Sequence, residues 1–434
     1  MPDELREEVV GLLRELIRID TSNPPGNETP AAELLADRLT EAGAECELVG
    51  PDPQRLNLVA RVRGRGVGPS VLLMAHTDVV PAPAANWTVP PFDGVVRDGR
   101  VVGRGAADMK GELAARTVAS MELARGGEPP AGDVVLVAEA DEERNTADVG
   151  LSWLVRERPD LVRTDYALNE GGGILLELAD GRRVVTVSVG EKVVGSLRIR
   201  VRGTAGHASI PDGADNPLRH VAAAIDALIA HRAPARVTPA LERALDVLGA
   251  PAGAGEERIE WARGLHPSLA DELPPMSRLT VTPTGTATHE PANVIPPYAD
   301  VICDCRALPG EGETEIRAHV EAALGDSFAY EVEMLEPLEG GTESEIGTPL
   351  YEAIEEYVAE RLPGAALLPI VTPGFTDSHW VRSGLGTVAY GFAPIFNMDI
   401  DAYHRGMHGA DESLEIADLA EMAESHLRIL RALG

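Results

Sequence analysis

Apolar residues recur with two different spacings along the chain, and each spacing predicts a different kind of element. Near the start the spacing is helical, at Leu5, Val9, Leu12, Leu13, Leu16 and Ile17. The breaker cluster Thr21 to Gly26 ends this predicted helix, and a second helix is expected from about Thr29 to Ala42. Further on, helical stretches such as 113–124 alternate with short apolar runs at 58–62, 71–75, 134–138 and 166–168. This alternation predicts an α/β fold, a mostly parallel sheet flanked by helices on both faces.

The order of expected elements changes from about residue 191. The pattern there predicts a strand at 193–201, a helix at 217–230, strands at 279–284 and 299–306, a helix at 313–323 and a strand at 328–335. This order is typical of a ferredoxin-like α+β domain. An Ala-, Glu- and Leu-rich stretch at about 234–275 is expected to be a helical insertion. We therefore expect residues 1–190 and 338–434 to form one domain, with residues 191–337 inserted into it.

Charge and cysteine content narrow the class of protein. The formal net charge is −32, from 38 basic and 70 acidic residues, and so acidic a surface disfavours nucleic acid and anionic membranes as partners. Cys46, Cys303 and Cys305 are an odd set, and the last two lie too close along a strand to bridge without distortion. No apolar signal core or spanning run is evident. We expect a cytoplasmic protein that neither enters nor binds a membrane.

Acids and histidines follow several of the expected strands. His76 and Asp78 follow one run, Asp141 to Glu143 follow another, and Glu170 follows a third, while Asp108 and His408 lie in Gly-containing loops. Each feature alone has an ordinary explanation: a histidine that caps a strand, a solvated acidic turn, or an acid at a helix start. In open α/β sheets, however, ligands bind at the carboxyl ends of strands. The sequence therefore predicts that these side chains converge at one edge of the sheet.

The same stretches resemble a known family, the M20 zinc metallopeptidases and amidohydrolases. This group includes glutamate carboxypeptidase, aminoacylase, acetylornithine deacetylase and succinyl-diaminopimelate desuccinylase. The matching stretches occur in the family's order over nearly the whole chain. They are His76-Thr-Asp-Val-Val-Pro81, Gly103-Arg-Gly-Ala-Ala-Asp-Met-Lys-Gly111, Ala140-Asp-Glu-Glu143, Asn169-Glu-Gly171, Gly203-Thr-Ala-Gly-His-Ala-Ser209, Asn293-Val-Ile-Pro296 and His408-Gly-Ala-Asp-Glu412.

The resemblance implies two Zn²⁺ ions per subunit, for which Co²⁺ or Mn²⁺ could substitute. By this resemblance His76, Asp108 and Glu143 hold one ion and Asp108, Glu170 and His408 hold the other. His404 competes for the last position, but His408 stands in the form that matches the family. Two divalent ions also suit three ligating carboxylates better than one does.

The same resemblance assigns roles around the metals. Glu142 is expected to be the general base that acts on a water between the two ions. Asp78 is expected to receive the far N–H of His76 through its carboxylate. His207 is expected to steady an oxyanion, often in the partner subunit's site, and Asn293 is given a related polar role. The inserted domain would then be a lid that also forms a homodimer.

One motif departs from the family's pattern. Many relatives carry Thr-Asp-x-Arg where this chain has Thr376-Asp377-Ser378-His379. Asp377 and His379 remain expected substrate-binding residues, although His379 cannot form the bidentate contact that arginine makes with a carboxylate. Arg306 or Arg382 is an alternative for that contact.

Three functions follow from these residues. The leading one is a metal-dependent hydrolase that cleaves an amide bond of a small peptide or an N-acyl amino acid. The second is a narrow biosynthetic deacylase of the acetylornithine or succinyl-diaminopimelate type. The third, of another class, is a non-catalytic binding protein on the same fold, which would require a missing ligand or base.

Overall fold

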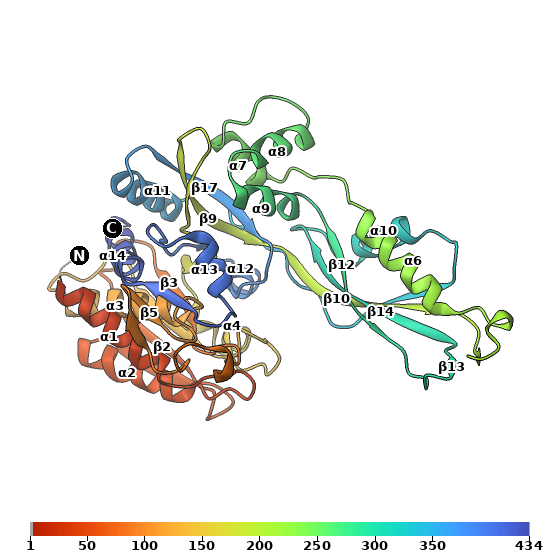
Figure 1. Cartoon of the computed structure of the whole chain (residues 1–434). Helices are drawn as coiled ribbons and strands as arrows, with labels where there is room; N and C mark the ends of the chain where they lie inside the picture. The colour runs from red at the N-terminus through yellow and green to blue at the C-terminus, as the bar shows by residue number, and fades with distance from the viewer. Residues whose placement is uncertain (1–2, 434) are drawn as a thin grey trace. The chain divides into compact units, whose positions relative to one another are not determined.

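The computed structural model describes residues 3–433, which form two compact units (Figure 1). The first unit comprises the chain up to Val189, Ser344–Ile370 and the residues from Thr376 onward. The second unit comprises Gly190–Glu343 and Val371–Phe375. Most of the second unit is thus one insertion in the sequence of the first, and a second, short segment, Val371–Phe375, joins it.

A nine-stranded sheet forms the centre of the first unit, and its strands follow the order β1-β2-β6-β3-β7-β18-β9-β17, with β8 paired to β9. Strands β6, β3, β7 and β18 are parallel to one another, whereas the pairs β1–β2, β2–β6, β8–β9 and β9–β18 are antiparallel. The sheet is therefore parallel in its centre and mixed overall. Its strands are β1 (Glu45–Val49), β2 (Asn57–Val62), β3 (Val71–His76), β6 (Val134–Glu139), β7 (Tyr166–Asn169), β8 (Leu175–Glu177), β9 (Arg183–Glu191), β17 (Ala365–Thr372) and β18 (Val388–Gly391).

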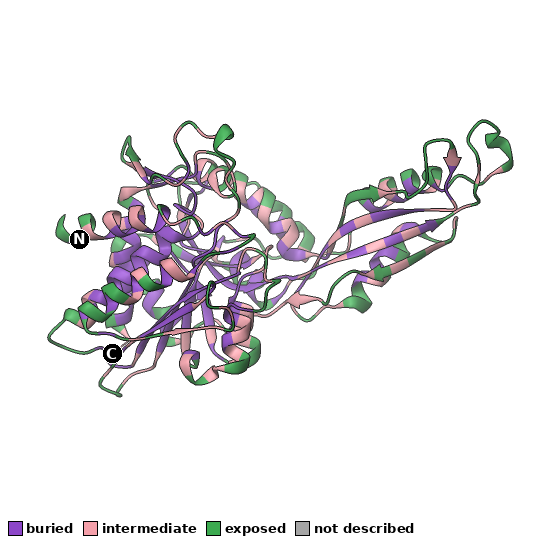
Figure 2. Cartoon of the chain, turned by 90° about the horizontal axis from the view of Figure 1, so that it is seen from below, coloured by how far each residue is buried: buried purple, intermediate pink, exposed green. Residues whose placement is uncertain are grey.

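Helices cover both faces of this sheet because its central strands are apolar on both sides. Every residue of β3 and β6 is buried, as expected for strands with helices above and below, and Figure 2 shows this buried centre. Helix α3 packs against α1, α2 and α14 over one face, and Leu151, Leu154 and Val381 pack on the other. The helices are α1 (Asp3–Ile17), α2 (Thr29–Ala42), α3 (Lys110–Arg125), α4 (Leu151–Glu157), α5 (Pro159–Val162), α11 (Pro349–Arg361), α12 (Ser378–Leu385), α13 (Ile400–Gly406) and α14 (Ile416–Ala432).

A small sheet joins two distant parts of the first unit. Strand β5 (Arg100–Val102) pairs with β4 (Val95–Arg97) and with β19 (Ser413–Glu415). The pairing fixes the loop before α3 beside the loop that follows α13. These two loops carry Asp108 and His408.

The second unit has the predicted ferredoxin-like order of elements. Its sheet follows β12-β14-β10-β15, with β16 (Glu339–Gly340) paired to β10. Buried positions alternate along β10, and the buried side chains pack with those of α6 and α10, an alternation visible in Figure 2. The main elements are β10 (Val193–Arg202), α6 (Pro217–Ala230), β12 (Thr280–Ala287), β14 (Tyr298–Ala307), α10 (Glu313–Leu324) and β15 (Tyr330–Met334).

Shorter elements complete the second unit. The stretch expected to be a helical insertion contains α7 (Pro239–Val247), α8 (Gly255–Arg263) and α9 (Pro267–Ser277). A separate pair of strands consists of β11 (Gly206–His207) and β13 (Val294–Ile295).

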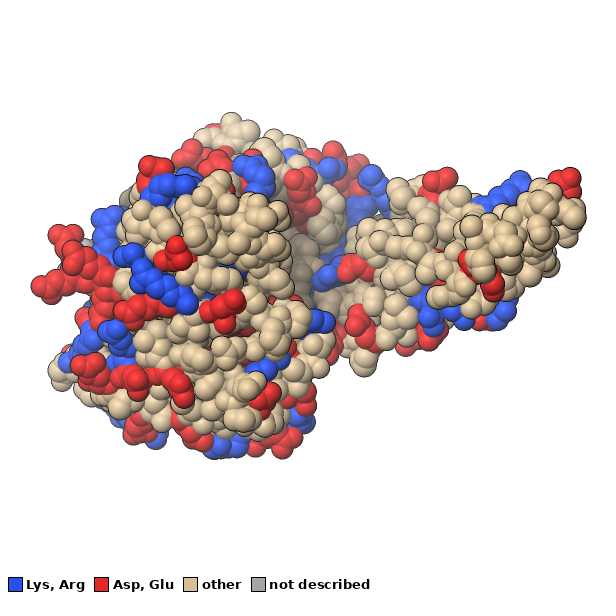
Figure 3. Space-filling view, turned by 60° about the horizontal axis from the view of Figure 1, so that its bottom comes forward, with Lys and Arg blue, Asp and Glu red and all other residues tan. Residues whose placement is uncertain are grey.

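Acidic and basic side chains are interspersed on the surface, as one face shows in Figure 3. Many of them form exposed ion pairs, such as Arg63 with Glu45 at 2.7 Å. Within residues 3–433, none of the helices has the length and apolar character needed to cross a membrane.

Candidate metal centre

The ends of three neighbouring strands supply most of the candidate residues. His76 is the last residue of β3 and Asp78 follows it, Asp141–Glu143 follow β6, and Glu170 follows β7. Strands β6, β3 and β7 are adjacent and parallel, so their carboxyl ends lie at one edge of the sheet. The predicted convergence of these side chains is thus present in the fold.

Two loops outside the sheet supply Asp108 and His408. Both loops are tied to each other by the buried carboxylate of Glu412, which accepts the backbone N–H groups of Gly105 at 3.0 Å, Ala107 at 2.8 Å and Asp108 at 3.0 Å. The same carboxylate pairs with the guanidinium of Arg104. Glu412 therefore fixes the loop of Asp108 against the loop that carries His408.

The carboxylate of Asp108 lies between the two histidines. Its Oδ1 is 3.1 Å from His76 Nε2, and its Oδ2 is 3.1 Å from His408 Nε2. Glu170 Oε2 lies 3.9 Å from His76 Nε2, whereas Glu143 Oε2 lies 3.1 Å from His408 Nε2. The five residues thus form two groups that share Asp108, each with one donor atom per residue within 4.8 Å of the others.

This grouping corrects the expected pairing of the glutamates. Glu143 lies with His408 and Glu170 lies with His76, the reverse of what the motifs suggested. Strand β3 lies between β6 and β7 in the sheet, so a carboxylate from either side can reach the centre. Sequence order alone does not indicate which carboxylate turns toward which histidine. His404, the alternative to His408, is exposed on α13 and belongs to neither group.

The donor set fits a pair of divalent cations. Imidazole nitrogens with carboxylate oxygens are ligands that zinc and similar ions accept. Glu143 Oε1 is buried without a hydrogen-bond partner among the described residues, and such an atom is costly unless something else binds it. Burial raises the pKa of Glu170 to about 8. A buried group of carboxylates like this one is stabilised by nearby positive charge.

The hydrogen bonds between Asp108 and the two histidines favour the charged forms of these side chains. Burial opposes ionisation of Asp108, but hydrogen bonds with His408 and His76 outweigh it and hold the pKa of Asp108 below its usual value. Hydrogen bonds with Asp108 and Glu143 raise the pKa of His408 to about 10. Asp108 therefore stays ionised between two partners.

Glu142 lies at the centre without being a member of either group. Its Oε2 is 3.9 Å from His76 Nε2, and its side chain is largely buried. Burial, followed by the nearby charge of Glu170, raises the pKa of Glu142 well above its usual value. A carboxyl group with a raised pKa beside an electrophilic centre is suited to accept and return a proton.

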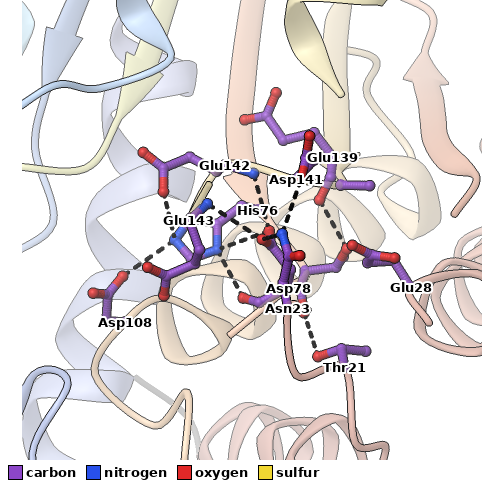
Figure 4. Close-up of polar contacts among 12 residues, drawn as sticks. Thr21, Asn23, Glu28, His76, Asp78, Asp108, Glu139, Asp141, Glu142 and Glu143 are labelled. Carbon is purple, nitrogen blue, oxygen red and sulfur yellow. Dashed lines mark hydrogen bonds and ion pairs between the residues drawn. The ribbon is translucent and has the colours of Figure 1, made fainter. Parts of the chain in front are cut away.

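Asp78 contacts His76 in a different way from the one expected. His76 Nδ1 is 2.9 Å from the backbone carbonyl oxygen of Asp78 and 3.6 Å from its carboxylate. The fully buried carboxylate instead accepts the backbone N–H groups of Glu142 and Glu143, each at 3.2 Å. Asp78 therefore holds the loop after β6 as well as the end of β3, as Figure 4 shows.

Buried polar residues that the motifs did not indicate lie next to this loop. Asn23, Glu28 and Arg55 are buried. Asn23 donates to Asp78 and Asp141, whereas Arg55 donates to Asp141 and to Glu28. Figure 4 shows Asn23 and Glu28 beside this loop. Asn23 lies in the cluster interpreted only as a helix breaker. The sequence could have singled out Asn23 only as a polar residue in a short Pro-containing segment. That pattern does not indicate which groups the amide contacts.

The expected substrate-binding residues of the first unit lie near α12. Asp377 is buried and its Oδ1 accepts the indole N–H of Trp380 at 3.0 Å. The His379 ring packs against Trp380 with a centroid distance of 5.0 Å. The guanidinium of Arg382 donates to Ser344 Oγ at 3.0 Å and to the carbonyl oxygen of Ala389 at 2.6 Å. These bonds hold Arg382 in the framework of the unit.

The other expected residues lie in the second unit. His207 is exposed on β11, and the backbone of Asn293 accepts the N–H of Ala208 at 3.0 Å, which places Asn293 beside the His207 turn. Arg306 on β14 already forms a bidentate contact with Asp304, with Nε–Oδ1 and Nη2–Oδ2 distances of 2.9 Å. A substrate carboxylate would have to compete with Asp304 for this guanidinium, so the role expected for Arg306 stays a prediction.

Comparison with known proteins gives concordant results. Residues 72–432 match the family model described as peptidase family M20/M25/M40. A succinyl-diaminopimelate desuccinylase of Alkalilimnicola ehrlichii is 38% identical over 299 residues, which cover 67% of each chain. These matches confirm the resemblance indicated by the motifs and the expectation of a metal-dependent hydrolase of amide bonds.

Solved structures show the fold in common. An M20 family metallo-carboxypeptidase from Sulfolobus solfataricus superposes with a TM-score of 0.72 at 18% identity, covering 98% of this chain and 99% of the other. A dinuclear metal-binding peptidase of the M20 family from Bacillus subtilis gives 0.64 at 14% identity, covering 99% and 98%. The expected fold class, an α/β domain with an inserted α+β domain, is confirmed.

Proposed function

Because this chain belongs to peptidase family M20/M25/M40, we propose that it is a two-metal hydrolase that cleaves an amide bond of a small peptide or an N-acyl amino acid. The observation that carries the proposal is the carboxylate of Asp108, which presents one oxygen to His76 and the other to His408 at 3.1 Å each. A carboxylate placed in this way is suited to bridge two cations.

We assign the ligands from the two groups of side chains. His76, Asp108 and Glu170 would hold one ion, and Asp108, Glu143 and His408 the other. Zinc is the proposed native ion, because its sites combine His and carboxylate ligands, with Co²⁺ or Mn²⁺ as substitutes. When bound, such a pair polarises a carbonyl group and lowers the pKa of water.

Glu142 is the proposed general base. Its Oε2 lies 3.9 Å from Nε2 of His76, and its backbone N–H donates to the carboxylate of Asp78. It takes the proton from the attacking water and returns it to the leaving nitrogen as the amide bond breaks. The raised pKa that burial gives Glu142 favours this return of the proton.

Residues outside the centre would act on the substrate. His207 and Asn293 are proposed to stabilise the developing oxyanion, with His207 supplied by the partner subunit of a homodimer that forms through the second unit. Asp377 and His379 are proposed to contact the substrate. The three free cysteines suit a reducing compartment, and we propose a cytoplasmic location.

A narrow desuccinylase is a second candidate, favoured by one observation. The relative from Alkalilimnicola ehrlichii, at 38% identity over 299 residues, is named as a succinyl-diaminopimelate desuccinylase. A substrate of this type carries carboxylates at both ends, so it would need cationic groups to bind it. Hydrolysis of one N-succinyl amino acid, with no cleavage of dipeptides, would select this candidate.

The test is incubation of the zinc- or cobalt-loaded protein with a mixed panel of dipeptides and N-acyl amino acids, with products identified by mass. We expect cleavage of at least one amide. Glu142→Gln should abolish turnover and leave two metals bound, whereas Glu143→Gln should lose metal. If no amide is cleaved, the non-catalytic binding protein becomes the better interpretation. If Glu142→Gln loses metal instead, the roles of the two glutamates are reversed.

A further inference from the structure

A short segment after α1 is pinned against the end of β3. The backbone N–H of Asn23 donates to the carbonyl oxygen of Val79 at 2.9 Å, and the N–H of Val79 donates to that of Thr21 at 3.2 Å. The hydroxyl of Thr21 donates to the carbonyl oxygen of Thr77 at 2.7 Å. These bonds bring the Asn23 side chain to the loop that contains Asp78.

The amide of Asn23 joins the carboxylate of Asp78 to that of Asp141, which lies in the acidic loop, residues 140–147. Its Nδ2 is 2.9 Å from Asp78 Oδ2 and 2.9 Å from Asp141 Oδ1, and all three side chains are buried. Ionised carboxylates only accept hydrogen bonds, so the NH₂ group, with its two donors, must face them. Figure 4 shows Asn23 between these residues.

Both carboxylates in turn fix the loop that carries Glu142 and Glu143. Asp78 accepts the backbone N–H groups of these two glutamates at 3.2 Å each. Asp141 immediately precedes them, has a positive φ of 66° and accepts the N–H of Ala147 at 2.6 Å. Asp141 is therefore held at both of its carboxylate oxygens, with Asn23 on one of them.

A neutral donor suits this position better than a charged one. Arg55 already supplies positive charge, since its Nη2 lies 3.2 Å from Asp141 Oδ1 while its Nε donates to Glu28 at 2.9 Å. The amide of Asn23 adds two donors to the buried carboxylates without adding charge beside the candidate metal ligands. An aspartate of the same shape would remove both donors and place a third carboxylate there.

We propose that Asn23 is a positioning residue for the acidic loop. It clamps Asp78 to Asp141 and so sets where Glu142 and Glu143 lie relative to His76. The catalytic consequence rests on the proposed function, whereas the clamp itself is a property of the loop. Residues that orient metal ligands in this way typically change metal affinity or activity by about 10- to 100-fold when replaced.

The test compares Asn23→Ala and Asn23→Asp with Thr21→Val. The control variant also removes a buried hydrogen bond between the same two segments, but it leaves the carboxylates untouched. Hydrogen exchange of the backbone over residues 140–147 is measured on the full chain, together with thermal unfolding, bound metal, kcat and KM on an amide from the substrate panel.

We expect Asn23→Ala to increase exchange over residues 140–147 by at least about tenfold. Its kcat should fall about 10- to 100-fold while KM changes by less than about threefold, and Asn23→Asp should lose more. Thr21→Val should lower the unfolding temperature but keep both the exchange pattern and kcat.

Unchanged exchange in Asn23→Ala, or an equal change in Thr21→Val, would overturn the proposal, because packing of the segment would then explain the effect. If the wild-type protein cleaves no amide, the proposed function fails. The exchange comparison still decides the role of Asn23 in that case.

Discussion

Arg55 is expected to be essential for the stability of the first unit. Its guanidinium contacts Glu28, which is fully buried, and Asp141, which is 2% exposed. Arg55→Met would leave two buried carboxylates without their counter-charge. Removing one partner of a buried ion pair costs about 3–5 kcal/mol. For a unit of this size, about 2 °C per kcal/mol gives a decrease of roughly 6–10 °C in the unfolding temperature.

Calorimetry of matched samples measures this decrease. Two further variants test whether buried, uncompensated charge is its cause. The double variant Arg55→Met/Glu28→Gln should recover part of the loss, because it removes one of the uncompensated charges. Arg63→Met breaks the exposed ion pairs of Arg63 with Glu45 and Asp133, and should lower the unfolding temperature far less than Arg55→Met, because exposed ion pairs contribute little to stability. The reasoning is refuted if Arg55→Met costs no more than Arg63→Met, or if the double variant is no more stable than Arg55→Met.

Three more predictions concern the amount of bound metal, the pH dependence of stability and the close packing at Gly391. His408→Ala should lower the bound metal toward one ion per chain, whereas His404→Ala should keep two, as elemental analysis would reveal. Burial raises the pKa of Glu272 to about 7, so its stabilising protonation is complete below pH 4.5 and is lost as the pH rises through 7. The free energy of unfolding of Glu272→Gln, measured in urea, should therefore rise relative to wild type by up to roughly 2 kcal/mol between pH 5 and pH 8. The opposite trend would show that burial does not raise the pKa of Glu272. A Cβ on Gly391 would lie 1.9 Å from the carbonyl oxygen of Glu170. Gly391→Ala should therefore lower the free energy of unfolding by about 2 kcal/mol or more, as measured by urea titration. It should also weaken metal binding, as measured by titration with the metal.

Strand-end chemistry was the part of the site that the sequence could predict. The buried runs of β3, β6 and β7 are strongly apolar. A polar residue directly after such a run therefore lies at the carboxyl end of the strand, at the edge of the sheet. The order of elements in the second unit was likewise readable, because the period of two along β10 changes to helical spacing in α6.

The finer geometry could not be predicted from the sequence. Whether Glu143 or Glu170 faces His408 depends on side-chain directions in loops, which no periodicity encodes. Asp78 was expected to bind His76 through its carboxylate, yet the backbone carbonyl makes the closer contact. Arg306 was expected as a substrate-binding residue, and its bidentate contact with Asp304 was not indicated by the sequence. Each of these outcomes depends on tertiary contacts between residues or on rotamers.

The placement of the second unit within the sequence has a consequence for synthesis on the ribosome. Strand β18, which pairs with β7, and helix α14, which packs against α3, both come after the inserted residues 190–343. A nascent chain therefore carries an open β7 edge, and an α3 that packs on α1 and α2 but lacks α14, until the residues after the insertion have been translated. Nearly the whole second unit is one continuous stretch, so it can fold while the first is still incomplete. Translation beyond the inserted residues thus precedes closure of the first unit, and its open strand edge is the part that a chaperone would shield in the meantime.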